Sequence, residues 1–275
     1  MADKNLIKTT MEKTIQQVII NKNNPGAENM LLDIFARIWA FWGMISFVVT
    51  FLIIFIPSMF SYFLPEKKGQ DYFIWVSRCW ISIWLRMIGC PVTVNGLQNF
   101  KAGQTYVVVY NHNAFLDVPL SAPFVPGGNK TIAKVSFTNV PIFSFFYKRG
   151  SVLVDRKNNA SRVKSFEGMK SVLQKGMHMC IYPEGTRNRT TEPLKAFHDG
   201  AFKLAVEAKS DIIPCVIVGT QKAMPIHKKF YLLPTRLYMH FLPPVSVKNQ
   251  SAQLLKETVF ELMKNKFVSE TGKQG

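Results

Sequence analysis

The chain has 275 residues, of which 48% are hydrophobic, and Lys and Arg outnumber Asp and Glu by 34 to 17, giving a net charge of +17. This length allows one substantial domain with an appended segment, and two domains of equal size are not expected. An apolar and strongly basic chain is suited to an anionic partner: nucleic acid, anionic lipid or an acidic carrier protein. Nucleic acid is not expected, because the sequence lacks an RNA-recognition aromatic signature, zinc-finger spacing and a basic helix followed by heptads.

The N-terminal segment and the cysteines indicate the compartment. Residues 1–29 are polar and carry both charge signs, without the short apolar core and cleavage site of a secretory signal. The four cysteines form no C-x-x-C pair, and Cys180 and Cys215 lie inside apolar runs, which is typical of buried thiols in a reducing compartment. We therefore do not expect secretion.

A first apolar segment predicts membrane contact. From Ile38 to Pro65 the chain has no charged residue, and this stretch exceeds the length needed to cross a bilayer. Core helices are seldom so uniformly apolar, so the pattern favours a membrane helix, with Pro57 bending or ending it. Cations flank the stretch on both sides, so a full span and a hairpin within one leaflet both remain open.

A second apolar stretch, residues 72–88, predicts a helix at the membrane interface. Trp75, Trp80 and Trp84 recur at helical spacing, whereas Arg78 and Arg86 interrupt the apolar pattern. We expect the tryptophans at headgroup depth and the arginines on lipid phosphates. Residues 30–88 are thus predicted to form a two-helix membrane anchor.

The remaining chain, residues 89–268, predicts an α/β domain. Short apolar runs typical of strands buried on both faces occur at residues 105–110, 151–154, 177–182 and 212–218. Amphipathic helical patterns occur at residues 160–175, 200–208 and 251–267. This alternation predicts a mostly parallel or mixed central sheet flanked by helices, with the apolar helical anchor before it. Residues 269–275 are expected to be a frayed tail.

A histidine and an aspartate stand five residues apart just after the run that ends at Tyr110. Functional groups of open α/β sheets gather where strands end, and His112 lies at such a place. Asp117 precedes Val118 and Pro119, which makes it a plausible helix N-cap. The turn could bring the Asp117 carboxylate to one imidazole nitrogen and leave the other facing a substrate, as a general base requires. A loop histidine beside a simple helix cap would have the same sequence.

A second motif, residues 182–187, has the properties of an anion site. Gly185 allows a close backbone approach or a positive φ. Thr186 offers a hydroxyl and Arg187 a planar pair of donors suited to a phosphate. Glu184 carries the wrong charge to touch phosphate, so we expect it to orient Arg187 or a glycerol hydroxyl. Lys134 and Arg156 could reach the same anion.

These motifs resemble the sequence blocks of the 1-acyl-sn-glycerol-3-phosphate acyltransferase family. The blocks are His112 with Asp117, residues 150–156, residues 182–187, and Ile213 with Pro214, in that order. The resemblance implies that His112 is the general base, that Asp117 is its partner, and that Glu184, Gly185, Thr186 and Arg187 bind the acceptor. It also places Lys134 and Arg156 near the phosphate and matches the apolar segment to the family's N-terminal two-helix anchor. This chain departs at residues 196–200, where His198 and Asp199 replace cations usual in the family.

The resemblance implies a membrane enzyme with its catalytic domain facing the cytoplasm. It would move an acyl group from a thioester to the sn-2 hydroxyl of 1-acylglycerol 3-phosphate, giving phosphatidate. Its partners would be membrane lipids, lysophosphatidate, and acyl-CoA or acyl carrier protein, and no nucleic acid, metal or other cofactor is expected. Because of the departure at His198 and Asp199, a lysolipid with an amino-acid-containing or zwitterionic head remains an alternative, as does a non-catalytic lipid-binding scaffold.

Overall fold

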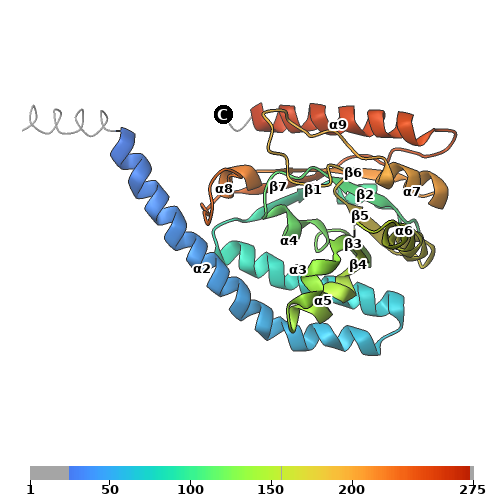
Figure 1. The fold of residues 1–275 in the computed structure, drawn as a ribbon, viewed down its shortest axis with the longest axis horizontal. Helices are drawn as coiled ribbons and strands as arrows, with labels where there is room; N and C mark the ends of the chain where they lie inside the picture. The colour runs from blue at the N-terminus through green and yellow to red at the C-terminus, as the bar shows by residue number, and fades with distance from the viewer. Residues whose placement is uncertain (1–24, 156, 273–275) are drawn as a thin grey trace, which may run out of the picture.

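A seven-stranded sheet forms the centre of the molecule (Figure 1). The computed structural model describes residues 25–155 and 157–272. The strands are β1 (Val92–Asn95), β2 (Val107–Tyr110), β3 (Asn129–Lys134), β4 (Ser151–Val154), β5 (His178–Ile181), β6 (Ile212–Val218) and β7 (Leu237–Phe241). Their order is β1-β7-β6-β2-β5-β3-β4, and each neighbouring pair is parallel except β6 with β7. The predicted α/β class with a mixed sheet is confirmed.

Helices cover both faces of this sheet. They are α2 (Pro25–Met59), α3 (Glu66–Met87), α4 (Asp117–Ser121), α5 (Phe143–Gly150), α6 (Asn159–Gln174), α7 (Gly200–Ala208), α8 (Thr220–Ala223) and α9 (Ala252–Gly272), with short 3-10 helices η1 (Phe60–Phe63), η2 (Leu97–Asn99) and η3 (Val135–Asn139). Successive side chains of β2 point to opposite faces. Val108 and Tyr110 pack in the cluster that includes α3, whereas Val107 and Val109 pack with α6, α7 and α9. Burial on both faces explains why the β2 sequence is apolar without alternation.

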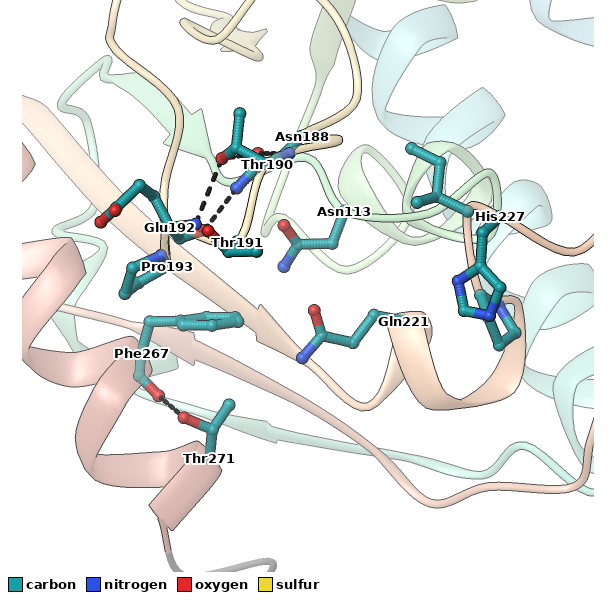
Figure 2. Close-up of a pocket in the computed structure, with 12 residues that line it drawn as sticks. Asn113, Asn188, Thr190, Thr191, Glu192, Pro193, Gln221, His227, Phe267 and Thr271 are labelled. Carbon is teal, nitrogen blue, oxygen red and sulfur yellow. Dashed lines mark hydrogen bonds between the residues drawn. The ribbon is translucent and has the colours of Figure 1, made fainter.

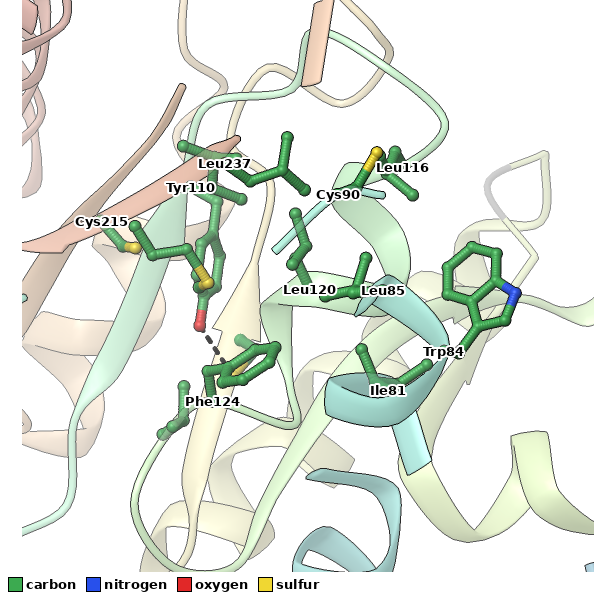
Figure 3. Packing of buried hydrophobic residues seen from close by; sticks show 14 of the residues in the cluster. Ile81, Trp84, Leu85, Cys90, Tyr110, Leu116, Leu120, Phe124, Cys215 and Leu237 are labelled. Carbon is green, nitrogen blue, oxygen red and sulfur yellow. Dashed lines mark hydrogen bonds between the residues drawn. The ribbon is translucent and has the colours of Figure 1, made fainter. Parts of the chain in front are cut away.

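The core between the sheet and α3 fixes the position of α4 (Figure 3). Leu120 of α4 is fully buried beside Leu85 of α3. The Tyr110 hydroxyl donates a hydrogen bond of 2.8 Å to the backbone oxygen of Ser121, the last residue of α4. The helix that begins at Asp117 is therefore held against the end of β2 by packing and by one buried hydrogen bond.

Most predicted elements lie where the sequence patterns place them. The bounds of β4, β6 and α7 agree with the predicted ranges, and those of β2, β5 and α6 agree within two residues. Helix α9 continues to Gly272, so residues 269–272 are helical, and residues 273–275 lie outside the described residues, as do residues 1–24 of the predicted polar segment. The sequence patterns did not predict β1, β3 and β7.

Helix α2 has the properties expected of a membrane helix. Residues 30–63 are long and apolar enough to cross a bilayer, and only 22% of the most apolar window is buried. The large apolar side chains that α2 exposes include Ile34, Ile38, Phe41, Ile45, Val49, Leu52, Ile53 and Ile56. A core helix would bury such side chains, so the exposed surface supports membrane association. Pro57 lies inside α2, which ends two residues later.

The second helix differs from its prediction as an interfacial helix. Trp80 and Trp84 of α3 are buried against α2, where their indole N–H groups donate to Thr50 Oγ1 at 2.9 Å and to the Gly43 carbonyl at 3.2 Å. Arg78 turns inward and donates to the carbonyls of residues 123 and 125 at 2.6 and 2.7 Å. Because α3 lies between α2 and the sheet, its tryptophans fill a helix interface. Trp75 and Arg86 stay exposed, as predicted.

Candidate active site

The two sequence motifs meet because their strands are neighbours. Strands β2 and β5 are parallel and directly paired, so the loops that follow them leave the same edge of the sheet. The loop after β2 carries His112, and the loop after β5 carries residues 182–195. His112 and Glu184, which are 72 residues apart in sequence, are joined by a hydrogen bond of 2.7 Å.

Asp117 holds the imidazole of His112. The Nδ1–H of His112 donates to Asp117 Oδ2 at 3.0 Å, and the backbone N–H groups of Asn113 and Ala114 donate to the same oxygen at 2.7 and 2.8 Å. Asp117 is fully buried, whereas the His112 side chain is 14% exposed. Because Nδ1 is committed to Asp117, Nε2 is the ring nitrogen left for a substrate.

Asp117 does not act as the helix N-cap that its sequence context suggested. Leu116 is the N-cap of α4, and Asp117 is the first helical residue. Its carboxylate turns back to the loop before the helix, where it accepts from residues 112–114. One oxygen of the carboxylate thus holds the backbone of the loop and orients the imidazole of His112. In the alternative interpretation, a loop histidine beside a simple helix cap, this contact between Asp117 and His112 would be absent.

Tyr182, the first residue after β5, supports the pair from the neighbouring loop. Its ring lies 4.4 Å from the imidazole of His112, centroid to centroid, and its hydroxyl donates to the backbone oxygen of Asp117 at 2.7 Å. Burial is the main cause that raises the pKa of Tyr182 well above its ordinary value, and the nearby Asp117 carboxylate raises it further. The hydroxyl therefore stays protonated and remains a donor.

Glu184 has a different role from the one predicted. The carboxylate is fully buried and accepts from the backbone N–H groups of His112 at 2.7 Å and Lys195 at 3.1 Å. Glu184 therefore holds two backbone N–H groups, whereas the prediction was that it orients Arg187 or a glycerol hydroxyl. Burial raises the pKa of Glu184 to about 7, although these two backbone donors act in the opposite direction. Glu184 fastens both loops to each other.

Cationic groups gather on the turn after β5. Gly185 has a φ of +70°, which is one of the two reasons for a glycine that the sequence left open. The Arg187 guanidinium lies over the ring of Phe115 at 5.5 Å, and the ammonium of Lys195 donates to Thr186 Oγ1 at 2.8 Å. Arg187 and Lys195 together give this edge of the sheet two positive charges within the loops that hold His112.

Of two further predicted residues, the structure describes Lys134, which does not reach this group. Lys134 ends β3 at the same edge of the sheet and is exposed. In the described ranges no hydrogen bond or ion pair joins Lys134 to His112, Thr186 or Arg187. Arg156 lies outside the described residues, so its predicted role stays a prediction.

Sequence reasoning missed three parts of the site. Lys195 stands alone between motifs, and only its spacing from Thr186 within one loop could have indicated it. Tyr182 lies in the second motif, but the motif gives no role to its hydroxyl. Asn188 donates its backbone N–H to the His112 carbonyl at 2.6 Å, and a backbone contact leaves no signal in the side-chain pattern. Asp199, a departure from the family pattern, is paired with Lys256 of α9 at 2.7 Å.

Comparison with known proteins shows what this arrangement is similar to. A family model described as Acyltransferase matches residues 91–218, which contain the whole His112 and Glu184 assembly. This part of the chain, somewhat less than half of its length, is thus similar to the acyltransferase family. The 1-acyl-sn-glycerol-3-phosphate acyltransferase of Saccharomyces cerevisiae is 28% identical over 188 residues, covering 66% of this chain and 61% of that protein. The 1-acyl-sn-glycerol-3-phosphate acyltransferase alpha of Mus musculus is 31% identical, covering 59% and 57%.

The matches confirm the resemblance drawn from the sequence blocks. The chain spans about three fifths of the length of these two curated relatives. Its fold is that of the crystal structure of the 1-acyl-sn-glycerophosphate acyltransferase from Thermotoga maritima, with a TM-score of 0.72 and 20% identity, covering 88% of this chain and 97% of that one. The α/β fold is therefore shared with the Thermotoga maritima protein.

Proposed function

We propose that this acyltransferase moves an acyl group from a thioester donor to the sn-2 hydroxyl of 1-acylglycerol 3-phosphate, with His112 as general base. The observation that carries the proposal is the orientation of His112, whose Nδ1 is held by the buried Asp117 while Nε2 is left for a substrate. The names of the relatives support the acceptor. The positive charges of Arg187 and Lys195 suit its phosphate.

In the proposed reaction His112 accepts one proton from the acceptor and later donates it to the leaving group. Nε2 accepts the proton of the sn-2 hydroxyl as its oxygen attacks the thioester carbonyl carbon. When the tetrahedral intermediate collapses, the carbon–sulfur bond breaks and the imidazolium returns the proton to the leaving thiolate. The products are phosphatidate and a free thiol. Asp117 stabilises the imidazolium between the two transfers and keeps the ring in the required tautomer.

In this proposal α2 anchors the enzyme at the membrane, where its lipid substrates are. The acceptor and product are amphiphiles that stay in the bilayer, so a site anchored at the interface shortens their path. The exposed apolar side chains of α2 support such an anchor, and the net charge of +17 attracts anionic lipid. We place the catalytic domain on the cytoplasmic side, where the buried free thiols Cys90, Cys180 and Cys215 stay reduced.

The first test compares two histidines. His112→Ala should abolish the incorporation of labelled acyl groups into lysophosphatidate, because no other group in the proposal takes the hydroxyl proton. His198→Ala is the matched control, since His198 is exposed on the neighbouring loop and has no part in the proposed chemistry. Normal incorporation by His112→Ala would contradict the proposal.

The second test identifies the acceptor head group. Lysophosphatidate, an amino-acid-containing lysolipid and a zwitterionic lysolipid should be supplied in competition, with acyl-CoA and acyl carrier protein as donors. We expect lysophosphatidate to be preferred, because two cations face the acceptor and the charge of Asp199 is already neutralised by Lys256. Preference for another head would reassign the acceptor, and binding of lysolipid without turnover would indicate the scaffold.

A further inference from the structure

A polar hollow of about 440 Å³ lies beside the loop of His112 (Figure 2). Four separate parts of the chain line it: the loop after β2 with Asn113, the loop after β5 with residues 188 and 190–193, residues 221 and 225–227 in and after α8, and the end of α9 with Phe267 and Thr271. None of the described residues that line the hollow is Lys or Arg. It is thus distinct in charge from the cationic turn that suits a phosphate.

One buried donor in this hollow has no partner. Asn113 is 5% exposed, and its Nδ2 makes no hydrogen bond among the described residues. Figure 2 shows the amides of Asn113 and Gln221 facing each other across the hollow, with the ring of Phe267 beside them. Buried polar groups are normally paired, so an acceptor on a ligand is the expected partner of Asn113.

The hollow borders the loop that carries the proposed base. Asn113 follows His112 directly, and the backbone N–H of Asn188, which also lines the hollow, donates to the His112 carbonyl at 2.6 Å. A ligand lying in the hollow therefore contacts the residue next to His112 in sequence. The lining offers amides, threonines, His227 and the carboxylate of Glu192, and it suits a ligand without negative charge that carries amides or hydroxyls.

We propose that this hollow binds the pantetheine arm of the acyl donor. The arm carries two amides, a hydroxyl and a small branched apolar group, and it ends in the thioester sulfur that the proposed reaction requires. Amides match Asn113 and Gln221, and the branched group matches the apolar surface of Phe267 and Pro193. Coenzyme A and acyl carrier protein present the same arm, so the hollow recognises what both donors share. This inference rests on the proposed thioester reaction.

The test fills the hollow from α9. Thr271→Trp places a large ring in the hollow, whereas Ser269→Trp is the matched control on an exposed position of the same helix. With lysophosphatidate as acceptor, Thr271→Trp should raise the KM for palmitoyl-CoA about tenfold or more and leave the KM for lysophosphatidate unchanged. The same rise is expected for palmitoyl carrier protein if the wild type uses it. Equal donor KM values in Thr271→Trp and Ser269→Trp would overturn the proposal.

A second pair of variants, with smaller changes, tests the proposal if Thr271→Trp does not fold. Gln221→Ala removes one amide from the hollow, and Gln253→Ala removes an exposed amide from α9. Only Gln221→Ala should reduce the preference for acyl-pantetheine over an acyl thioester of N-acetylcysteamine, which lacks most of the arm. If Gln221→Ala keeps the wild-type preference for acyl-pantetheine, the proposal that the hollow binds the pantetheine arm is contradicted.

Binding separates this proposal from the proposed function. Titration of palmitoyl-CoA into His112→Ala should show binding that the added Thr271→Trp change weakens about tenfold. If that result holds while the wild type fails to acylate lysophosphatidate, the hollow is supported and the acceptor is wrong. If the wild type acylates lysophosphatidate but Thr271→Trp binds the donor normally, the reaction is supported and the hollow is not the donor site.

Discussion

The buried carboxyl of Glu184 predicts a stability that depends on pH. Its pKa is raised from an ordinary value of 4.5 to about 7, mainly by burial. Between these two values the unfolded chain has lost the proton while the folded chain retains it, so stability falls as pH rises and becomes level above pH 7. Each pKa unit corresponds to about 1.4 kcal/mol, so the ionised carboxylate costs the folded state about 3 kcal/mol above pH 7.

Glu184→Gln should remove this dependence. Glutamine matches the protonated carboxyl in size and lack of charge, and its oxygen can accept from the His112 N–H, but its NH2 group cannot accept from the Lys195 N–H. Near pH 4.5 the variant should therefore be less stable than the wild type by about 1–3 kcal/mol. Between about pH 4.5 and pH 8 the difference in free energy of unfolding between the variant and the wild type should shift by about 3 kcal/mol in favour of the variant, because only the wild type carries the ionised carboxylate.

Urea unfolding in detergent micelles, followed by tryptophan fluorescence from pH 4.5 to 8, measures this difference. Glu192→Gln is the matched control in the same loop, and because Glu192 is exposed its change should leave the pH profile as it is in the wild type. A constant difference between Glu184→Gln and the wild type over this range would refute the reasoning, since it would mean that Glu184 titrates alike in both states.

Three further substitutions test the site. Asp117→Asn should lower kcat by about 10²- to 10⁴-fold with an unchanged circular dichroism spectrum, because the amide cannot stabilise the imidazolium; an unaltered kcat would exclude the pair from catalysis. Lys195→Ala should raise the KM for lysophosphatidate about tenfold, equivalent to about 1.4 kcal/mol, while Lys209→Ala, at the end of α7, should not. Tyr182→Phe should cost about 1 kcal/mol of stability in thermal unfolding through loss of its hydrogen bond to Asp117; no loss would show that water replaces the hydroxyl.

Hydrophobic pattern predicted the elements that are buried on both faces. Strands β2 and β6 are apolar throughout and fully buried, so their sequences carry an unambiguous signal. Strand β1 alternates between partly buried and exposed residues, and β3 contains Lys130 and Lys134. Their place in the sheet comes from pairing with β7 and with β4 and β5, which a local pattern does not contain.

The motifs contain several of the residues that the structure brings together, but they do not show what each side chain contacts. The pairing of His112 with Asp117 follows from a short turn, so spacing was sufficient to predict it. The role of Glu184 depends on the backbone of a loop 72 residues away, and that contact exists only because β2 and β5 are neighbours. The inward turn of Arg78 and the burial of Trp80 likewise depend on α2 and on residues 123–125.

Three hydrogen bonds join the loop after β2 to the loop after β5, so the two loops should open together. His112 N–H binds Glu184, Asn188 N–H binds the His112 carbonyl, and the Tyr182 hydroxyl binds the Asp117 carbonyl. Neither loop can leave the sheet edge without breaking all three. The amide protons of residues 112 and 188 should therefore exchange with solvent deuterium together, as one opening unit. If the proposed reaction holds, lipid should enter by movement of elements outside this pair of loops, because those elements can shift without breaking the three bonds.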